Sequence, residues 1–243
     1  KLGAVASGQT VSATGGTGTD TFELAAASTG TLKLDGGNGT DTVVLGAGYT
    51  GTFAIDGTDI KNIEVVDASS VTGSLNITGT AAAAETITGG SGNDTIDGKG
   101  GADVLAGGNG DNLFKFYGGG ESVTGGTGTD TLELASTVTG SVSLDGTTLS
   151  GIEVVDASAV TGDLTLTGNA TAATTFKLGG VGEGVTGGDG TDTLELTSDF
   201  AGDSVALTAT GGQYNSIEVV DASAVTGSLN ITGTAAAETI TGA

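Results

Sequence analysis

A nine-residue repeat dominates this sequence and leaves few folds open to it. Its clearest copy reads G-G-S-G-N-D-T-I-D at residues 89–97, and looser copies begin at Gly98 and Gly107. Three longer units surround this array, and each carries the phrase G-G-x-G-T-D-T. These phrases start at Gly36, Gly125 and Gly187. The first interval is 89 residues and the second is 62 residues, a difference of 27 residues or three nonapeptides. Nine residues therefore make one complete structural step.

Apolar residues follow the same step. The first inward apolar residue of each expected strand advances by nine to twelve positions. The series is Val43, Phe53, Ile63, Leu75, Ile87, Ile96, Leu105, Phe114, Val123, Leu132, Val142, Ile152, Leu164 and Phe176. Polar and apolar residues alternate within a step, which is typical of a strand with one buried face, and Thr, Val and Gly disfavour helix. The sequence predicts an all-β fold, a parallel β-solenoid (β-roll or β-helix) with about eleven two-strand coils.

The repeats also predict the organisation of the chain. We expect one continuous β-solenoid over residues 1–243. Its internal units are 1–88, 89–124 (the nonapeptide array), 125–186 and 187–243. The chain opens at Lys1-Leu2-Gly3, which resembles Lys177-Leu178-Gly179, and it closes inside a repeat at Thr241-Gly242-Ala243. Both ends favour the interpretation that the chain is a fragment of a longer protein.

Composition excludes several classes of function. A net charge of −23 argues against nucleic acid and anionic lipid as direct partners, and no stretch is apolar enough for membrane insertion. The chain has no Cys, so bound metal instead of disulfides would have to constrain an extracellular fold. Without His or Cys, the Ser–His and Cys–His nucleophile pairs are impossible, and the acidic residues lie in repeated turns instead of one cleft. We therefore expect that the chain is not an enzyme.

The phrase G-G-x-G-x-D, followed by x-apolar-x, points to calcium. Paired Gly residues allow the positive φ values of a tight turn and leave carbonyl oxygens exposed, and the Asp adds a carboxylate. Ca²⁺ takes six to eight oxygen ligands, so one turn cannot supply its whole shell. A second turn, stacked one coil away and two nonapeptides along the chain, would complete it. Calcium ions are therefore the expected cofactor and partner.

The expected metal ligands follow from the spacing. The complete turns supply Asp20, Asp41, Asp94, Asp130 and Asp192, and Asp103 lies in a variant turn. Turns that lack part of the glycine pattern supply Asn112, Glu85, Glu121 and Glu183. Steps of nine residues divide the central set into two ladders. These are Glu85–Asp103–Glu121 and Asp94–Asn112–Asp130.

Other aspartates have simpler interpretations. The side chains in the V-D-A-S phrases either cap the next turn or bind metal from outside, and capping is the favoured alternative. These residues are Asp67, Asp156 and Asp221. A third group precedes glycine in ordinary turns, where we expect solvated side chains. Its members are Asp35, Asp56 and Asp145.

The nonapeptides resemble the RTX (hemolysin-type) calcium-binding repeats of secreted bacterial proteins, most strongly over Gly89–Lys115. The longer units are similar to calcium-dependent surface-layer proteins. This resemblance implies a calcium-binding turn followed by a short β-roll strand, and type I secretion to the bacterial cell surface. It also implies a structural protein of a surface layer or extracellular array, which folds and assembles on Ca²⁺ binding. Self-association into a lattice or filament follows, and a cell-surface polysaccharide is a further candidate partner.

Two alternatives stay open. The chain could be a stalk segment of a large RTX adhesin, which a neighbouring binding domain would favour. It could also be an ice-binding solenoid, which needs a flat and regular array of Thr or Asn on one face. The uneven spacing of nine to twelve residues argues against that array.

Overall fold

The structure is a computed structural model, and it describes residues 1–144, 146–180, 183–200, 204–208, 211–234 and 236–242. The described residues form strands and turns without any helix, so none of them belongs to a helix that could cross a membrane. The chain divides into two compact units, residues 1–130 and 131–243. Every strand pair within each unit is parallel. The predicted fold class, an all-β parallel solenoid of about 11 turns, is confirmed.

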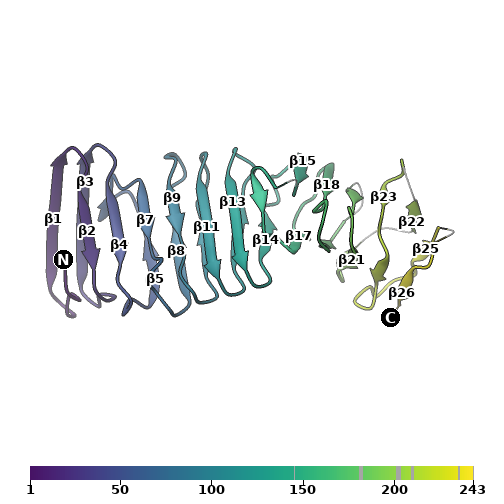
Figure 1. Cartoon of the computed structure of the whole chain (residues 1–243), viewed down its shortest axis with the longest axis horizontal. Helices are drawn as coiled ribbons and strands as arrows, with labels where there is room; N and C mark the ends of the chain where they lie inside the picture. The colour runs from purple at the N-terminus through teal and green to yellow at the C-terminus, as the bar shows by residue number, and fades with distance from the viewer. Residues whose placement is uncertain (145, 181–182, 201–203, 209–210, 235, 243) are drawn as a thin grey trace. The chain divides into compact units, whose positions relative to one another are not determined.

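Three sheets build the first unit, and their strands lie side by side in Figure 1. The longest has the order β2 (Thr21–Leu24), β4 (Thr42–Leu45), β7 (Val65–Asp67), β9 (Thr86–Thr88), β11 (Val104–Asn109) and β13 (Ser122–Thr127). A second has the order β5 (Gly51–Ala54), β8 (Leu75–Thr78), β10 (Thr95–Asp97) and β12 (Leu113–Phe116). The third has the order β1 (Thr10–Thr17), β3 (Thr31–Asn38) and β6 (Ile60–Lys61).

Two sheets build the second unit. One has the order β14 (Thr131–Leu134), β17 (Val154–Ala157), β19 (Thr175–Leu178), β21 (Thr193–Leu196), β24 (Val219–Asp221) and β26 (Thr239–Thr241). The other has the order β15 (Gly140–Ser143), β18 (Leu164–Thr167), β20 (Gly184–Thr186), β23 (Tyr214–Asn215), β22 (Ser204–Thr208) and β25 (Asn230–Thr232). The short strand β16 (Leu149–Ser150) follows β15 in the chain.

The strand register explains the sequence period. Where nonapeptides occur, Thr86 pairs with Val104 and Val104 pairs with Ser122, so one coil consumes two repeats. The longer units give longer coils, because Thr42 pairs with Val65. That coil also contains a short strand, β6, beyond the two expected, and Ile63 lies between β6 and β7 instead of in a strand.

The core is a set of stacked columns. In the first unit Phe53, Ile77, Ile96 and Phe114 lie opposite one another on successive strands, and each is 2% exposed or less. All fourteen residues of the predicted inward series are buried. Each such side chain contributes about 2 kcal/mol by leaving water. The core consists mainly of such columns of aliphatic and Phe side chains, so contacts in the turns must add to the stability of the fold.

The glycine turns show why the repeat demands glycine at particular positions. In the turn 36–41, Gly37 and Gly39 have φ values of 104° and 132°, which side chains other than glycine rarely adopt. Strand β3 runs on through the first two glycines, and Gly37 pairs with Gly16 of the coil before. A Cβ on Gly37 would overlap the Gly16 carbonyl oxygen. The glycine phrase thus extends the strand and lets neighbouring coils approach closely.

Candidate metal centres

An acidic residue stands directly before every strand of the longest sheet in the first unit. The members of this edge ladder are Asp20, Asp41, Glu64, Glu85, Asp103 and Glu121. Three pairs of successive members are joined between coils. Asp41 Oδ1 accepts the N–H of Asp20 at 2.8 Å, Glu64 Oε2 accepts the N–H of Asp41 at 2.8 Å, and Asp103 Oδ1 accepts the N–H of Glu85 at 2.9 Å. One carboxylate oxygen of each acceptor is therefore used to hold the preceding coil.

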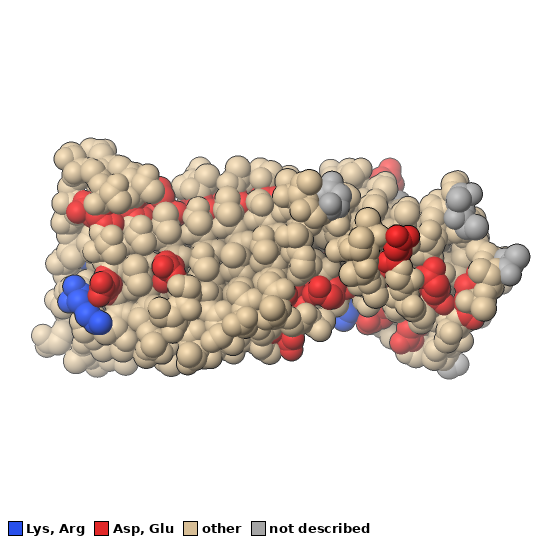
Figure 2. All heavy atoms as spheres, in the orientation of Figure 1, with Lys and Arg blue, Asp and Glu red and all other residues tan. Residues whose placement is uncertain are grey.

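A second ladder lies before the strands of the neighbouring sheet. Asn112 Oδ1 accepts the N–H of Asp94 at 2.9 Å, and Asp130 Oδ1 accepts the N–H of Asn112 at 2.9 Å. The predicted division of the central residues into two ladders is confirmed by these bonds and by the strand register. Figure 2 shows acidic side chains in a row along the part of the chain that begins at the N-terminus.

The second unit repeats the arrangement. Asp192 Oδ1 accepts the N–H of Thr174 at 2.7 Å, and Glu218 Oε2 accepts the N–H of Asp192 at 2.8 Å. Glu183 stands before β20 in the other sheet of this unit. The same bond therefore links neighbouring coils in both units.

Burial separates the predicted ligands from most other polar residues. All but one of them expose 3% or less of their surface. These are Asp41, Glu85, Asp94, Asp103, Asn112, Glu121, Asp130, Glu183 and Asp192. The exception is Asp20, which is half-buried in the N-terminal coils. Only Asp97 and Thr174 join this buried polar set within the described part of the chain.

Several buried carboxylates keep one oxygen without a hydrogen-bond partner among the described residues. The oxygens are Asp41 Oδ2, Asp103 Oδ2, Asp192 Oδ2, Glu85 Oε2 and Glu183 Oε2. A buried, ionised oxygen without a partner is costly, typically by several kcal/mol. Such an atom is where a bound cation would stabilise the fold most.

Carbonyl oxygens lie close to these carboxylates. A Cβ built on Gly36 would be 2.5 Å from Asp41 Oδ2, and the Asn62 carbonyl oxygen of the next coil would be closer still. A Cβ on Gly187 would be 2.5 Å from Asp192 Oδ2 and would also overlap the Ser216 carbonyl oxygen. The first glycine of a turn therefore leaves a space in which a carboxylate and a carbonyl oxygen from two coils converge.

This set of donors fits calcium. Carboxylate and carbonyl oxygens are the ligands that Ca²⁺ prefers. No group of three or more acidic, His or Cys side chains converges among the described residues, so carbonyl oxygens and water would supply most of the shell. Each ladder residue would contribute one carboxylate ligand from its coil, on one side of the bound ion.

The turns differ in how their side chains are used. Both oxygens of Asp94 accept N–H groups, Oδ1 from Leu75 and Oδ2 from Gly90, each at 2.8 Å. Asn112 Nδ2 donates to Asp130 Oδ1 at 2.9 Å, so this amide bridges two coils. Glu85 Oε1 accepts the Thr80 hydroxyl at 2.5 Å, and Glu121 Oε2 accepts the Gly118 N–H at 3.0 Å. Each of these glutamate side chains therefore also binds the loop that precedes it in the chain.

Burial changes the acidity of the ladders. It raises the pKa of Glu85 to about 7, and the neighbouring Asp103 carboxylate adds to this rise. Burial also raises the pKa of Asp192 to about 6, with the Glu218 and Asp189 charges as further causes. The pKa values of other ladder residues are raised for the same first reason. These residues are Asp94, Asp103, Glu121, Asp130 and Glu183.

The remaining aspartates behave mainly as caps. Asp67, Asp156 and Asp221 accept the N–H of the serine two residues on, at 2.9–3.0 Å, which confirms the predicted caps. The prediction for Asp35 is wrong, because this residue lies inside strand β3 and forms an ion pair with Lys61 at 3.0 Å. Asp56 lies in a turn as predicted, and Asp145 lies outside the described residues.

Three ladder residues were missed by the sequence reasoning. Glu64, Glu218 and Thr174 lack the glycine pattern, but each stands directly before a strand in the way that Asp41 does. Their position directly before a strand is the one signal that could have identified them as ladder residues. Asp97 is a separate case, since it pairs with Lys99 at 2.8 Å and is not part of a ladder.

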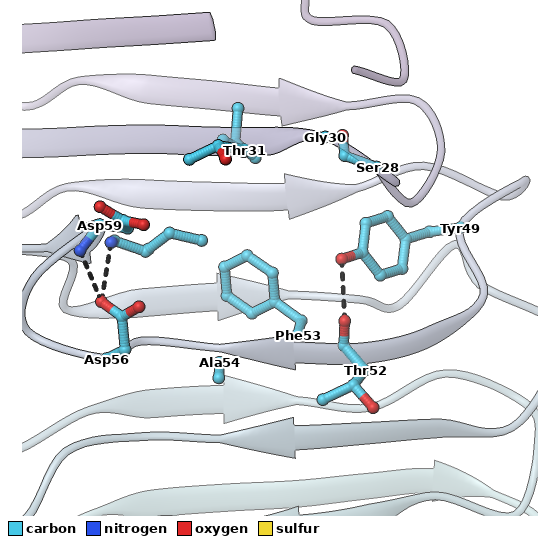
Figure 3. Close-up of a pocket in the computed structure, with 11 residues that line it drawn as sticks. Ser28, Gly30, Thr31, Tyr49, Thr52, Phe53, Ala54, Asp56 and Asp59 are labelled. Atoms are coloured by element: carbon cyan, nitrogen blue, oxygen red, sulfur yellow. Dashed lines mark hydrogen bonds between the residues drawn. The ribbon is translucent and has the colours of Figure 1, made fainter. Parts of the chain in front are cut away.

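A hollow of about 270 Å³ in the first unit is a different kind of site (Figure 3). The rings of Tyr49 and Phe53 pack edge to face there, with centroids 6.3 Å apart. Asp56 Oδ1 accepts the N–H of Thr58 and of Asp59 at 2.8 Å, and Asp59 pairs with Lys33 at 2.5 Å. These carboxylates are hydrogen-bonded or ion-paired, and they are less buried than most of those in the ladders.

Comparison with known proteins identifies the repeat. The family model of the RTX calcium-binding nonapeptide repeat matches this chain in four copies, over residues 33–49 and 80–114. The matched segments contain Asp41, Glu85, Asp94, Asp103 and Asn112. The curated proteins contain no match to the chain. The chain thus carries RTX calcium-binding repeats within a β-solenoid.

Proposed function

We propose that this chain is a calcium-binding structural protein that folds on Ca²⁺ and forms part of a bacterial surface layer or a similar extracellular array. The observation that carries the proposal is a set of buried carboxylates whose second oxygen has no hydrogen-bond partner among the described residues. At Asp41 and Asp192, the first glycine of the turn lies close both to that oxygen and to a carbonyl oxygen of the next coil. The RTX match over residues 33–49 and 80–114 supports calcium as the ion. We assign the chain no catalytic role.

The ladder residues have two tasks in this mechanism. One oxygen of Asp41, Asp103 or Asp192 accepts an N–H from the coil before, which fixes the stacking. The other oxygen stays available for a cation beside the first glycine of the turn. Bound calcium supplies the positive charge that lets these carboxylates be buried in ionised form.

The expected size of the effect is large for a thin core. With a Kd of about 0.1 mM and about 1 mM free calcium, each site adds roughly 1.4 kcal/mol to the free energy of unfolding. Five such sites would add about 7 kcal/mol, which is comparable to the whole stability of an ordinary domain. Calcium would then decide whether the chain is folded.

Removing one ladder carboxylate tests the proposal. We expect Asp103→Asn to bind at least one calcium ion fewer per chain, because the amide keeps the bond to the Glu85 N–H and loses only the charge. Isothermal titration calorimetry measures the stoichiometry. The matched control is Asp67→Asn, which changes a turn cap and should bind as many ions as the unmodified chain. Equal losses in both variants would contradict the assignment of the ladders.

The assembly needs a separate test. We expect purified chain in millimolar calcium to form ordered sheets or filaments, visible by negative-stain electron microscopy, and to return to single particles in chelator. A net charge of −23 keeps the chains apart without calcium. Single particles in calcium, at every protein concentration, would refute the array and favour the stalk of an adhesin.

A further inference from the structure

One glycine turn of the nonapeptide array differs from the others at its last position. The turn 107–112 reads G-G-N-G-D-N and ends in Asn112, where the complete turns end in aspartate. It lies within residues 80–114, which the RTX family model matches, so a calcium ion would be expected beside it. Asn112 is 2% exposed. A buried amide therefore occupies the place in which most other turns of the ladders bury a carboxylate.

The hydrogen bonds of Asn112 fix the orientation of its amide. Its Oδ1 accepts the N–H of Asp94 at 2.9 Å, so the coil before is held as it is elsewhere in the ladders. Its Nδ2 donates to Asp130 Oδ1 at 2.9 Å and to the Gly110 carbonyl oxygen at 3.1 Å. The reverse orientation would set an N–H against an N–H and an oxygen against two oxygens, which is unfavourable. Both hydrogens of the amide are therefore used within the turns.

The amide nitrogen lies where another turn places a carboxylate oxygen. A Cβ built on Gly107 would be 2.5 Å from Asn112 Nδ2 and 2.6 Å from the Gly125 carbonyl oxygen of the next coil. A Cβ built on Gly36 would likewise be 2.5 Å from Asp41 Oδ2, beside a carbonyl oxygen of the next coil. The same space therefore exists in both turns. In one turn it contains an oxygen without a partner, and in the other it contains an N–H donor.

A cation does not fit beside that donor. The hydrogens of a side-chain amide carry partial positive charge, so Nδ2 is no ligand for Ca²⁺ and repels the ion. Two oxygens that are suited to a cation, Asp130 Oδ1 and the Gly110 carbonyl oxygen, already accept these hydrogens. The amide also buries no net charge, so the turn has less need of a cation than a turn that buries a carboxylate.

Further hydrogen bonds join this turn to both neighbouring coils. The Asp111 N–H donates to Asn93 Oδ1 at 2.9 Å, and Asp111 Oδ1 accepts the N–H of Thr129 at 2.8 Å. The Thr127 hydroxyl donates to Asn109 Oδ1 at 2.9 Å. Together with the bonds of the buried amide, these contacts connect three successive coils without a metal ion.

We infer that the side-chain amide of Asn112 takes the place of a calcium ion in the turn 107–112, so that hydrogen bonds instead of metal hold this turn. The inference rests on the proposed calcium binding by the other turns. It differs from the expectation drawn from the sequence, in which Asn112 is itself a metal ligand. Replacing Nδ2 by an oxygen should therefore convert the turn into a calcium site.

Asn112→Asp makes that replacement. The new carboxylate can keep the bond to the Asp94 N–H, and its second oxygen would lie beside Gly107, as Asp41 Oδ2 lies beside Gly36. We expect the variant to bind one calcium ion more per chain than the unmodified chain. Isothermal titration calorimetry measures the number of ions, and circular dichroism in calcium checks that the variant is folded.

Asn112→Ala is the matched control. It removes the bonds to Asp94 and Asp130, so the thermal midpoint in calcium should fall. The number of bound ions should nevertheless equal that of the unmodified chain, because no ligand is lost. A readout that needs no variant is the exchange of the Asn112 side-chain NH₂ hydrogens, measured by NMR in calcium. We expect this exchange to be slow, because both hydrogens are bonded to buried or partly buried acceptors.

Two results would overturn the inference. One is a smaller number of ions bound by folded Asn112→Ala, which would make Asn112 a ligand. The other is an unchanged number bound by Asn112→Asp. Either result leaves the proposed calcium function standing, provided that Asp103→Asn still loses an ion. If the unmodified chain binds no calcium, the proposed function and this inference fall together.

Discussion

In chelator at neutral pH, we expect the far-ultraviolet circular dichroism of this chain to lose its β-sheet signal, and we expect millimolar calcium to restore it. The cause is electrostatic. The chain carries a net charge of −23, and its ladders bury carboxylates such as Asp41 and Asp192 at 0% exposure. Without a cation, folding must bury these charges with one oxygen unpartnered, and the thin core does not offset that cost.

Magnesium is the control for this experiment. Mg²⁺ is smaller, requires near-octahedral geometry and gives up its water reluctantly, whereas turns rich in carbonyl oxygens suit Ca²⁺. We therefore expect equal concentrations of Mg²⁺ to leave the chain unfolded. A β-sheet spectrum that is the same in chelator and in calcium would remove the folding switch from our account.

Acid should restore structure to the calcium-free chain. Folded Glu85 has a pKa of about 7 and folded Asp192 a pKa of about 6, both above their ordinary values of 4.5 and 3.8. The folded state therefore holds protons that the unfolded state has released. This contribution to stability is fully present below pH 4 and is lost as the pH rises through 6 to 7. Each pKa unit corresponds to about 1.4 kcal/mol, so the two groups together shift the free energy of unfolding by a few kcal/mol.

Circular dichroism of the calcium-free chain between pH 7.5 and 4.5 measures this dependence, as β-sheet signal gained when the pH falls. The stability of the double variant Glu85→Gln and Asp192→Asn should depend less on pH, because the two substitutions remove the carboxyl groups that titrate. The control Asp67→Asn and Asp221→Asn also removes two charges, but from caps, and should keep the original slope. Stability that rises with pH in the unmodified calcium-free chain would contradict the raised pKa values.

The strands could be predicted because their signal is repeated. Ile96, Leu105 and Phe114 recur at nine-residue intervals, and each is 1% exposed or less. A short period of this kind fixes both the strand and its neighbour in the next coil. The extra strand β6 was not predictable in this way, since it lies in a long coil where Leu34 pairs with Ile60 and no constant interval applies.

The ladders could be predicted only in part. Aspartates within glycine turns were found, because glycine marks the places where coils approach closely. Glu64 and Glu218 occupy the same ladders without that mark, and their longer side chains reach the N–H groups of Asp41 and Asp192 in the preceding coil. Their position directly before a strand becomes informative only when the register is known. The role of each side chain as a calcium ligand stays a prediction.

The side-chain bonds of the ladders that join the coils point the same way along the chain. Asp41 holds Asp20, Asp103 holds Glu85, Asp130 holds Asn112, and Asp192 holds Thr174, so each residue is secured by one that follows it in the sequence. During synthesis from the N-terminus, a coil that has just emerged lacks the ladder side chain that will bind its N–H group. The ladder bonds of a coil should therefore form only after the coil that follows it in the sequence has been made.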